Sequence, residues 1–217
     1  MSELPPSRKV SWFYRFVKRG FDVFNSLLLL IVLLPLLLIL ALLVVCTSRG
    51  GAIYLDPRIG KNGKPFKLFK FRSMVHDAEL HPEKYLTPEQ MEQWLTERKV
   101  DNDPRLTKFG RFMRKTSLDE LPQFLNIFLG TMSFVGPRPI TDFELKKHFS
   151  DAEAQRMLMC RPGLLGVWAV SGRSNVTFES GERQKLELSY LEKRSLGFDL
   201  KLIFKALPAV ITRKGAE

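Results

Sequence analysis

The sequence predicts an α/β protein made of a membrane segment followed by a small domain that mixes short strands with helices. The first observation is Leu27–Cys46, which contains twenty residues without a charge. The second is a pair of β-type runs around an Asn-Gly turn, and the third is a series of segments with helical apolar spacing. We therefore expect residues 1–48 to form a basic N-terminus and a membrane helix, and residues 49–217 to form the domain.

The membrane segment leaves two topologies open. A straight helix over Leu27–Cys46 is about 30 Å long, which is enough to cross a bilayer core. Both flanks are strongly basic, which favours the cytoplasmic side for both ends. Pro35 lies near the centre, where it removes a backbone donor and kinks a helix. The segment is therefore either a helix broken at Pro35 that returns to the same face, or a single span with a tolerated proline.

The strand candidates follow the membrane segment. Ala52–Leu55 and Pro65–Phe71 are short β-type runs, and Asn62-Gly63 between them is a strong hairpin signal. The polar stretch Asp77–Val100 predicts a surface loop with a short helix from Thr87, and we assign it no chemistry.

The helix candidates occupy most of the remaining chain. Apolar residues at helical spacing, or a polar run of helix formers, predict helices over Leu106–Lys115, Leu118–Leu129, Ile140–Met159 and Gly181–Arg194. A last amphipathic helix carries a stripe formed by Leu200, Ile203, Phe204, Leu207 and Ile211. This stripe fits either the domain core or a membrane surface.

Charge and composition restrict the classes of partner. The formal net charge is +11, from 34 basic and 23 acidic residues, which suits nucleic acid, an anionic membrane or a phosphorylated substrate. The sequence has no zinc-ligand spacing, no aromatic RNA-binding pattern and no heptad with a basic region, so we exclude nucleic acid. Cys46 and Cys160 form no disulfide framework, which fits a reducing cytoplasm.

An adjacent pair of carboxylates, Asp119 and Glu120, is the strongest chemical signal. Ser117-x-x-Glu120 is a capping box, so the pair could simply begin a helix. Pro122 instead favours a later helix start, with Leu118 or Asp119 as the cap. In that case the helix N-terminus opens beside both carboxylates and attracts phosphate oxygens. Both interpretations stay open from the residues alone.

Basic side chains surround this pair in the sequence. Arg114 lies just upstream, and Arg138 stands between two prolines that stiffen its backbone and aim its guanidinium. Lys70 and Arg72 alternate with phenylalanines, which places both cations on one face of a strand, for phosphate binding or for solvent. Carboxylates beside guanidinium groups suit chemistry on a phosphate ester, and the apolar segment indicates a lipid substrate.

Six ordered motifs give the chain its resemblance to a known family. They are Lys18–Asp22, Phe69–Met74, Leu106–Gly110, Ser117–Gln123, Met132–Pro139 and Arg161–Gly163. Over about Tyr14–Arg213 the chain resembles the bacterial sugar transferase family of monotopic phosphoglycosyltransferases. The resemblance implies a re-entrant membrane helix hairpin that carries a small cytosolic α/β domain with interfacial amphipathic helices. It also implies the bacterial inner membrane as location, with the catalytic domain on the cytoplasmic face.

The same resemblance implies an activity. These enzymes transfer a sugar-1-phosphate from a UDP-sugar to polyprenyl (undecaprenyl) phosphate, the first membrane step of exopolysaccharide, lipopolysaccharide or glycoconjugate synthesis. The family pattern makes Asp119 the nucleophile, which forms a covalent phosphosugar intermediate, and Glu120 its partner at a Mg²⁺ ion. Arg114 and Arg138 match the phosphate-binding arginines, and Pro35 matches the proline that breaks the re-entrant helix.

Three positions depart from the family pattern, and two other functions remain open. Leu34 replaces a frequent Ser, Thr131 a usual Asp, and Ala169 a common Gln. A UDP-sugar hydrolase and a non-catalytic membrane-anchored scaffold are the alternatives. No residue pattern selects the sugar or the polysaccharide pathway, or decides between a monomer and a homo-oligomer.

Overall fold

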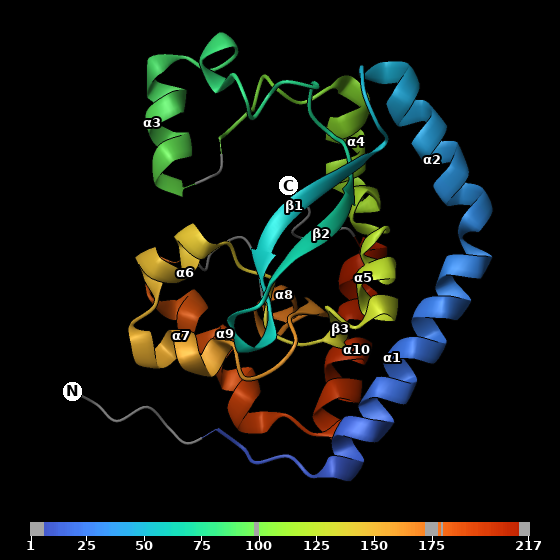
Figure 1. Cartoon of the computed structure of the whole chain (residues 1–217), viewed down its shortest axis with the longest axis vertical. Helices are drawn as coiled ribbons and strands as arrows, with labels where there is room; N and C mark the ends of the chain where they lie inside the picture. The colour runs from blue at the N-terminus through green and yellow to red at the C-terminus, as the bar shows by residue number, and fades with distance from the viewer. Residues whose placement is uncertain (1–6, 98–99, 172–177, 179, 213–217) are drawn as a thin grey trace. The chain divides into compact units, whose positions relative to one another are not determined.

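A computed structural model describes residues 7–97, 100–171, 178 and 180–212, with the backbone alone for 96–97 and 207–212 (Figure 1). The chain packs as two compact units, each assembled from separated stretches of sequence. Of the described residues, those up to 32, from 55 to 69 and from 123 onward form the first unit, and those from 33 to 54 and from 70 to 122 form the second. The predicted division at residue 48 concerns membrane insertion and stays a prediction.

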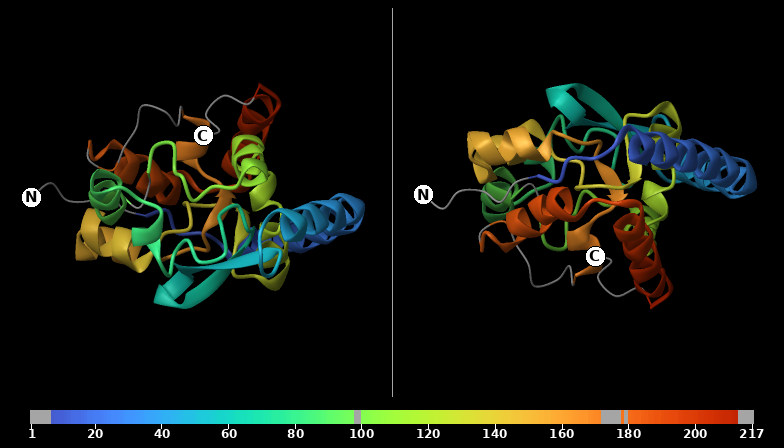
Figure 2. Two further views of the ribbon diagram at one scale, coloured as in Figure 1. Left: turned by 90° about the horizontal axis from the view of Figure 1, so that it is seen from above. Right: turned by 90° about the horizontal axis from the view of Figure 1, so that it is seen from below.

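The first unit contains most of the helices and one small sheet. Its helices are α1 (Trp12–Val32), α5 (Gln123–Leu129), α6 (Asp142–His148), α7 (Asp151–Met157), α8 (Val167–Val170), α9 (Glu182–Lys193) and α10 (Leu196–Thr212). Its strands β3 (Ser133–Val135) and β4 (Gly163–Leu165) pair in parallel, with Ser133 opposite Gly163. Its core is formed by Ile140, Leu145, Phe149, Met157, Leu188 and Leu191. Figure 2 shows α9 and α10 as the orange-red end of the chain, and both contact α8.

Polar contacts hold α1 against the rest of the first unit. The buried Asp22 carboxylate accepts hydrogen bonds from Ser133 Oγ at 3.1 Å and from the Phe134 amide at 3.0 Å. Arg19 donates to the carbonyls of Ile127 and Phe128, the C-terminal end of α5, at 2.7 and 2.8 Å. Figure 1 shows α1 running beside α5. These contacts account for the Lys18–Asp22 motif.

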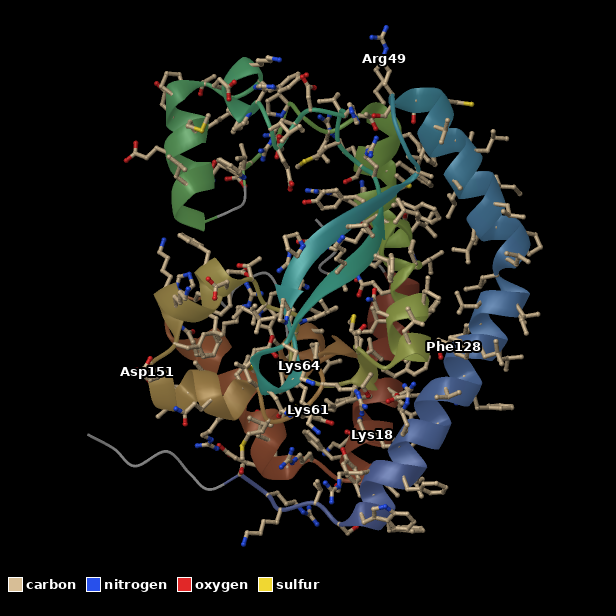
Figure 3. The ribbon with its side chains drawn as sticks, viewed as in Figure 1. Lys18, Arg49, Lys61, Lys64, Phe128 and Asp151 are labelled. Atoms are coloured by element: carbon tan, nitrogen blue, oxygen red, sulfur yellow. The ribbon has the colours of Figure 1, made fainter. Side chains whose placement is uncertain are left out.

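A second group of polar contacts joins α1 to α9 and α10. Lys18 Nζ lies 2.7 Å from Asp199 Oδ2, and Tyr14 donates to the same oxygen at 2.9 Å (Figure 3 labels Lys18). Tyr190 donates to Asp199 Oδ1 at 2.8 Å. Another face of α1 exposes Trp12, Phe13 and Phe16, whose exposed fractions are 63–69%. The helix is thus amphipathic, as in helices that lie in a membrane interface.

The second unit surrounds a smaller core of Leu40, Val44, Phe71 and Met113. Its elements are α2 (Leu34–Thr47), η2 (Pro82–Lys84), α3 (Pro88–Glu97), α4 (Lys108–Thr116) and η3 (Leu118–Glu120). The hairpin of β1 (Ile53–Ile59), η1 (Lys61–Gly63) and β2 (Pro65–Phe71) contributes residues to both units. Asn62 and Gly63 have φ angles of 59° and 74°, the left-handed region that favours Asn and Gly, so the predicted turn is confirmed.

The predicted membrane segment is a broken helix. The break is at Leu33, and Pro35 lies in the first turn of α2, where its missing N–H costs no hydrogen bond. Among the described residues no single helix is long and apolar enough to cross a membrane, but α1 and α2, bent by 64°, pass the test together. The α/β class is confirmed, whereas the re-entrant topology stays a prediction.

Two predicted helices prove to be shorter than expected. The segment Leu118–Leu129 is divided into η3 and α5, and α5 begins only at Gln123, after Pro122. Leu118 and Asp119 are therefore not its caps. The segment Ile140–Met159 is divided into α6 and α7, because Thr141 and Ser150 each begin a new helix with a complete capping box.

The last predicted helix is present, and its apolar stripe is divided between exposed and buried positions. α10 begins at Leu196, and Leu200 and Phe204 are 47% and 66% exposed. Leu202 and Ala206 are buried instead. The core interpretation of the stripe is wrong for Leu200 and Phe204. The side chains of Leu207 and Ile211 lie outside the described residues.

Candidate active site

The turn after α4 places the carboxylate pair. Thr107 caps the helix by accepting a hydrogen bond from the Gly110 amide at 2.8 Å. Ser117 ends it with a left-handed φ of 56°, which turns the chain directly into η3. Ser117 makes no side-chain capping bond there, so the capping-box interpretation of Glu120 is wrong. The local structure leaves Asp119 and Glu120 without that capping role.

Asp119 is the buried member of the pair, with 8% of its surface exposed. Burial raises the pKa of its carboxyl above the ordinary 3.8, and the neighbouring Glu120 charge raises that pKa further. The cations of Lys70 and Arg114 act in the opposite direction and lower the pKa. The structure therefore brings together four of the predicted residues, two carboxylates and two cations, within one unit.

Close packing between α4 and the segment after β2 fixes Arg114. Its Nε donates to Ser73 Oγ at 3.0 Å, and the Thr107 amide donates to the Ser73 carbonyl at 3.1 Å. A Cβ atom on Gly110 would lie 1.8 Å from that carbonyl oxygen, so only glycine fits. Met74 and Leu106 form an isolated antiparallel bridge beside these contacts. The Phe69–Met74 and Leu106–Gly110 motifs are thus two sides of one contact.

Arg72 is directed elsewhere in the same unit. Its Nη1 donates to the Arg49 carbonyl at 2.8 Å and lies 3.2 Å from His76 Nδ1. The predicted role of Arg72 in phosphate binding stays a prediction. Among the described residues, no group of three or more His, Cys, Asp and Glu side chains is arranged to hold a metal ion. Asp119 and Glu120 offer two carboxylates only.

Arg138 belongs to the first unit, where glycines shape its turn. The Gly136 amide donates to the Leu165 carbonyl at 3.0 Å, and the Gly163 amide donates to the Pro137 carbonyl at 2.7 Å. A Cβ on Gly163 would lie 2.0 Å from the Gly136 nitrogen, so the two backbones touch. This close approach explains why the Met132–Pro139 and Arg161–Gly163 motifs accompany each other.

Two charged side chains on α9 lie near the same turn. The Glu187 carboxylate, 2% exposed, accepts the Arg138 amide at 3.0 Å, and burial raises the pKa of its carboxyl. The Arg183 guanidinium stacks on Trp168 at 4.2 Å and on Phe178 at 4.0 Å. Burial and the Arg138 charge lower the pKa of Arg183 to about 10. The Arg138 side chain itself is exposed, with its guanidinium 5.5 Å from the Trp168 ring.

Sequence reasoning missed Glu187 and Arg183, because nothing distinguishes them from the other charges of a polar helix. Thr131, a departure from the family pattern, has a structural contact: its hydroxyl donates to the Asn126 carbonyl at 3.1 Å.

Known proteins resemble this chain over nearly its whole length. The family model described as bacterial sugar transferase matches residues 13–213. An "Exopolysaccharide production protein ExoY" of Sinorhizobium fredii is 42% identical over 201 residues, which is 92% of this chain and 87% of that protein. An "Undecaprenyl-phosphate galactose phosphotransferase" of Salmonella typhimurium is 42% identical over 93% of this chain and 42% of its own length. A "UDP-glucose:undecaprenyl-phosphate glucose-1-phosphate transferase" of Escherichia coli is 36% identical over 88% of this chain and 39% of its own length.

The extent of the match defines the class of protein, a sugar-phosphate-transferring enzyme. The chain belongs to the bacterial sugar transferase family. The predicted family and enzyme class are confirmed.

Proposed function

We propose that this chain transfers a sugar-1-phosphate from a UDP-sugar to polyprenyl phosphate, which yields polyprenyl-diphosphate-sugar and UMP. The observation that carries the proposal is the buried Asp119, paired with Glu120 and opposed by Lys70 and Arg114. Membership of the family supports the general reaction. A partly desolvated carboxylate with nearby cations is suited to attack a phosphate, because the cations offset its repulsion by the substrate.

The proposed reaction has two steps. In the first, an Asp119 carboxylate oxygen attacks the sugar-proximal phosphorus, the bond from that phosphorus to the UMP oxygen breaks, and UMP leaves. The sugar phosphate is then held on Asp119 as an acyl phosphate. In the second, a phosphate oxygen of polyprenyl phosphate attacks the same phosphorus. The Asp119 carboxylate is released, and the lipid diphosphate sugar is formed.

Charge is the main obstacle to this reaction, because nucleophile and substrates are all anions. Two like charges about 4 Å apart repel by roughly 4 kcal/mol at an effective dielectric near 20. Lys70 and Arg114 already act on Asp119 and reduce this cost. Arg138, exposed and carried by a stiff turn, is proposed to bind a phosphate through its two-pronged guanidinium. Arg72, whose Nη1 donates to the Arg49 carbonyl, is proposed to offer its other N–H groups to a phosphate.

The carboxylate pair fits a magnesium ion. Mg²⁺ commonly takes one or two protein carboxylates together with substrate phosphates, and Glu120 is close enough to Asp119 to raise its pKa by repulsion. Asp119 and Glu120 would hold the ion, which supplies positive charge for the phosphate oxygens when it is bound.

A membrane location is part of the proposal, because polyprenyl phosphate is a lipid. The exposed aromatic face of α1 and the bent, apolar α1–α2 pair support insertion from one side. We place the chain at the bacterial inner membrane, with the catalytic residues on the cytoplasmic face where nucleotide sugars are present. The basic flanks of the membrane segment agree with that orientation.

Release of UMP from a panel of UDP-sugars, with and without polyprenyl phosphate, tests the proposal. A transferase gives lipid-dependent turnover and identifies the sugar. Lipid-independent turnover would make the chain a UDP-sugar hydrolase. Absence of turnover with every sugar would leave a membrane-anchored scaffold.

A further inference from the structure

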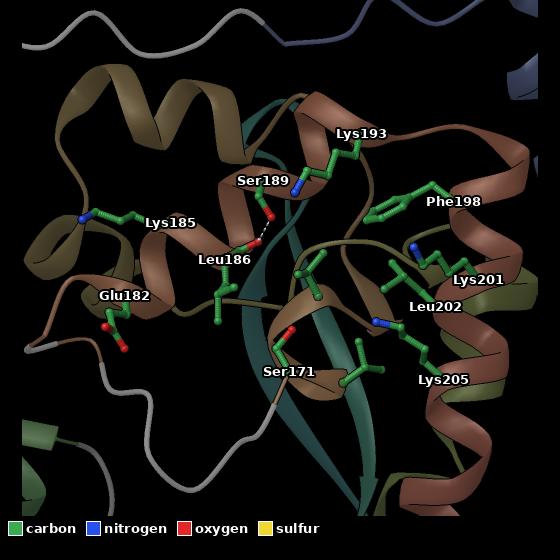
Figure 4. A pocket seen from close by; sticks show the side chains of 12 residues that line it. Ser171, Glu182, Lys185, Leu186, Ser189, Lys193, Phe198, Lys201, Leu202 and Lys205 are labelled. Atoms are coloured by element: carbon green, nitrogen blue, oxygen red, sulfur yellow. Dashed lines mark hydrogen bonds between the residues drawn. The ribbon is translucent and has the colours of Figure 1, made fainter.

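A groove in the first unit lies between α8, α9 and α10, and it contains neither Asp119 nor Arg138. Its volume is about 800 Å³. Apolar side chains from all three helices line it, among them Val167, Leu186, Phe198 and Leu202 (Figure 4). Leu202 is buried, and the other three are partly exposed. The surface is therefore an apolar trough open to its surroundings.

The charged side chains of this groove are mostly basic. Four lysines line it, Lys185, Lys193, Lys201 and Lys205, against one carboxylate, Glu182. All four lysines are exposed. In Figure 4, Lys193 on α9 and Lys201 and Lys205 on α10 extend towards the space between these two helices. The groove thus presents a local excess of positive charge over an apolar surface.

α10 also connects the groove to a surface suited to a membrane. Leu200 and Phe204 are exposed, and each directly precedes a groove lysine, Lys201 or Lys205. Residues four apart align along a helix, so an apolar row and a basic row run side by side on α10. Such a helix places its apolar row in the acyl region and its ammonium groups at the depth of lipid phosphates.

We propose that this groove binds an anionic membrane phospholipid. Lys193, Lys201 and Lys205 hold its phosphate, and an acyl chain lies on Phe198 and Leu202. The charge of the groove selects an anionic head group, because these three lysines face only one carboxylate in its lining, Glu182. The apolar lining favours an anion that carries an apolar chain over a fully hydrated anion. The site is distinct from the transfer reaction, so loss of one function leaves the other measurable.

The test uses the full chain in phosphatidylcholine nanodiscs that contain a titrated fraction of phosphatidylglycerol, with native mass spectrometry to count retained phosphatidylglycerol. The combined variant Lys193→Gln/Lys201→Gln/Lys205→Gln should bind phosphatidylglycerol on the order of 100-fold more weakly, from three lost lysine contacts. The matched control is Lys61→Gln/Lys64→Gln/Lys67→Gln, which removes the same charge from the β1–β2 hairpin of the same unit. It should retain the lipid.

Equal loss in the two variants would show diffuse attraction to the chain's positive charge and overturn the site. Unchanged retention in both would also overturn it. If polyprenyl phosphate added at equal mole fraction displaced phosphatidylglycerol, the groove would be a site for the acceptor lipid, and the proposal would be overturned. All six lysines lie at the surface, so both variants should unfold at the wild-type temperature. Phe198→Ser leaves the charge unchanged and should also weaken the retention of phosphatidylglycerol.

Discussion

Replacing Gly110 with alanine tests whether packing of α4 on Ser73 positions the carboxylate pair. The added Cβ would lie 1.8 Å from the Ser73 carbonyl oxygen, a contact that must open to about 3.0 Å or more. The opposing atoms are backbone, so α4 itself must move. Overpacking of this kind costs about 1–3 kcal/mol of stability. A displacement near 1 Å of a catalytic group also costs on the order of 100-fold in rate.

The assay compares UMP release and thermal unfolding of Gly110→Ala with those of Gly20→Ala and Gly197→Ala. These control glycines are also helical, but an added Cβ meets nothing within 4 Å, so alanine should leave stability unchanged or raise it by up to about 1 kcal/mol. We expect Gly110→Ala to lose both stability and activity. Wild-type activity in Gly110→Ala would refute the claim that this contact sets the position of Arg114 and Asp119.

Three further predictions concern charge. Arg138→Lys should lower turnover at least about tenfold with little change in unfolding temperature, because lysine cannot bind a phosphate through two parallel hydrogen bonds; reduced stability with normal turnover would make Arg138 structural. UMP release should rise with pH as Asp119 ionises, with a midpoint above the ordinary carboxyl pKa of 3.8. Arg114→Gln removes a charge that lowers this pKa, so the midpoint should move upward. A downward shift, or no shift, would contradict the assignment of the midpoint to Asp119. The pKa of Asp119 is raised in the folded state, so its neutral carboxyl stabilises the protein below the unfolded-state pKa, and this stability is lost as pH rises through the folded-state pKa. Asp119→Asn should therefore unfold at a higher temperature than wild type at pH 8. A lower unfolding temperature would contradict burial as the cause of the raised pKa.

Local chemistry made several features predictable from the sequence. The Asn62-Gly63 turn, the helix after Thr87 and the polar helix before Arg194 follow from short-range propensities that tertiary contacts do not override. The helix break beside Pro35 follows because proline has no N–H for the interior of a continuous helix, whereas the first turn of a new helix does not need one. The roles of the catalytic residues came from the family resemblance and stay predictions.

Other features depend on contacts between distant segments. The left-handed Ser117 could not be foreseen, because its sequence context also fits a capping box. Glu187 is buried and accepts a hydrogen bond from the Arg138 amide, 49 residues away in sequence. The exposed Phe204 and buried Leu202 on α10 depend on which of its faces meets the rest of the unit. Helical spacing alone does not determine that choice.

Mass spectrometry of the protein after incubation with a UDP-sugar alone tests whether Asp119 carries a covalent sugar phosphate. The wild-type chain should gain the mass of a sugar phosphate on the peptide that contains Asp119 and lose it when polyprenyl phosphate is added. Asp119→Asn should bind the UDP-sugar, gain no mass and release essentially no UMP. Normal turnover by Asp119→Asn, in a preparation free of wild-type enzyme, or an adduct on another residue, would show that Asp119 is not the nucleophile.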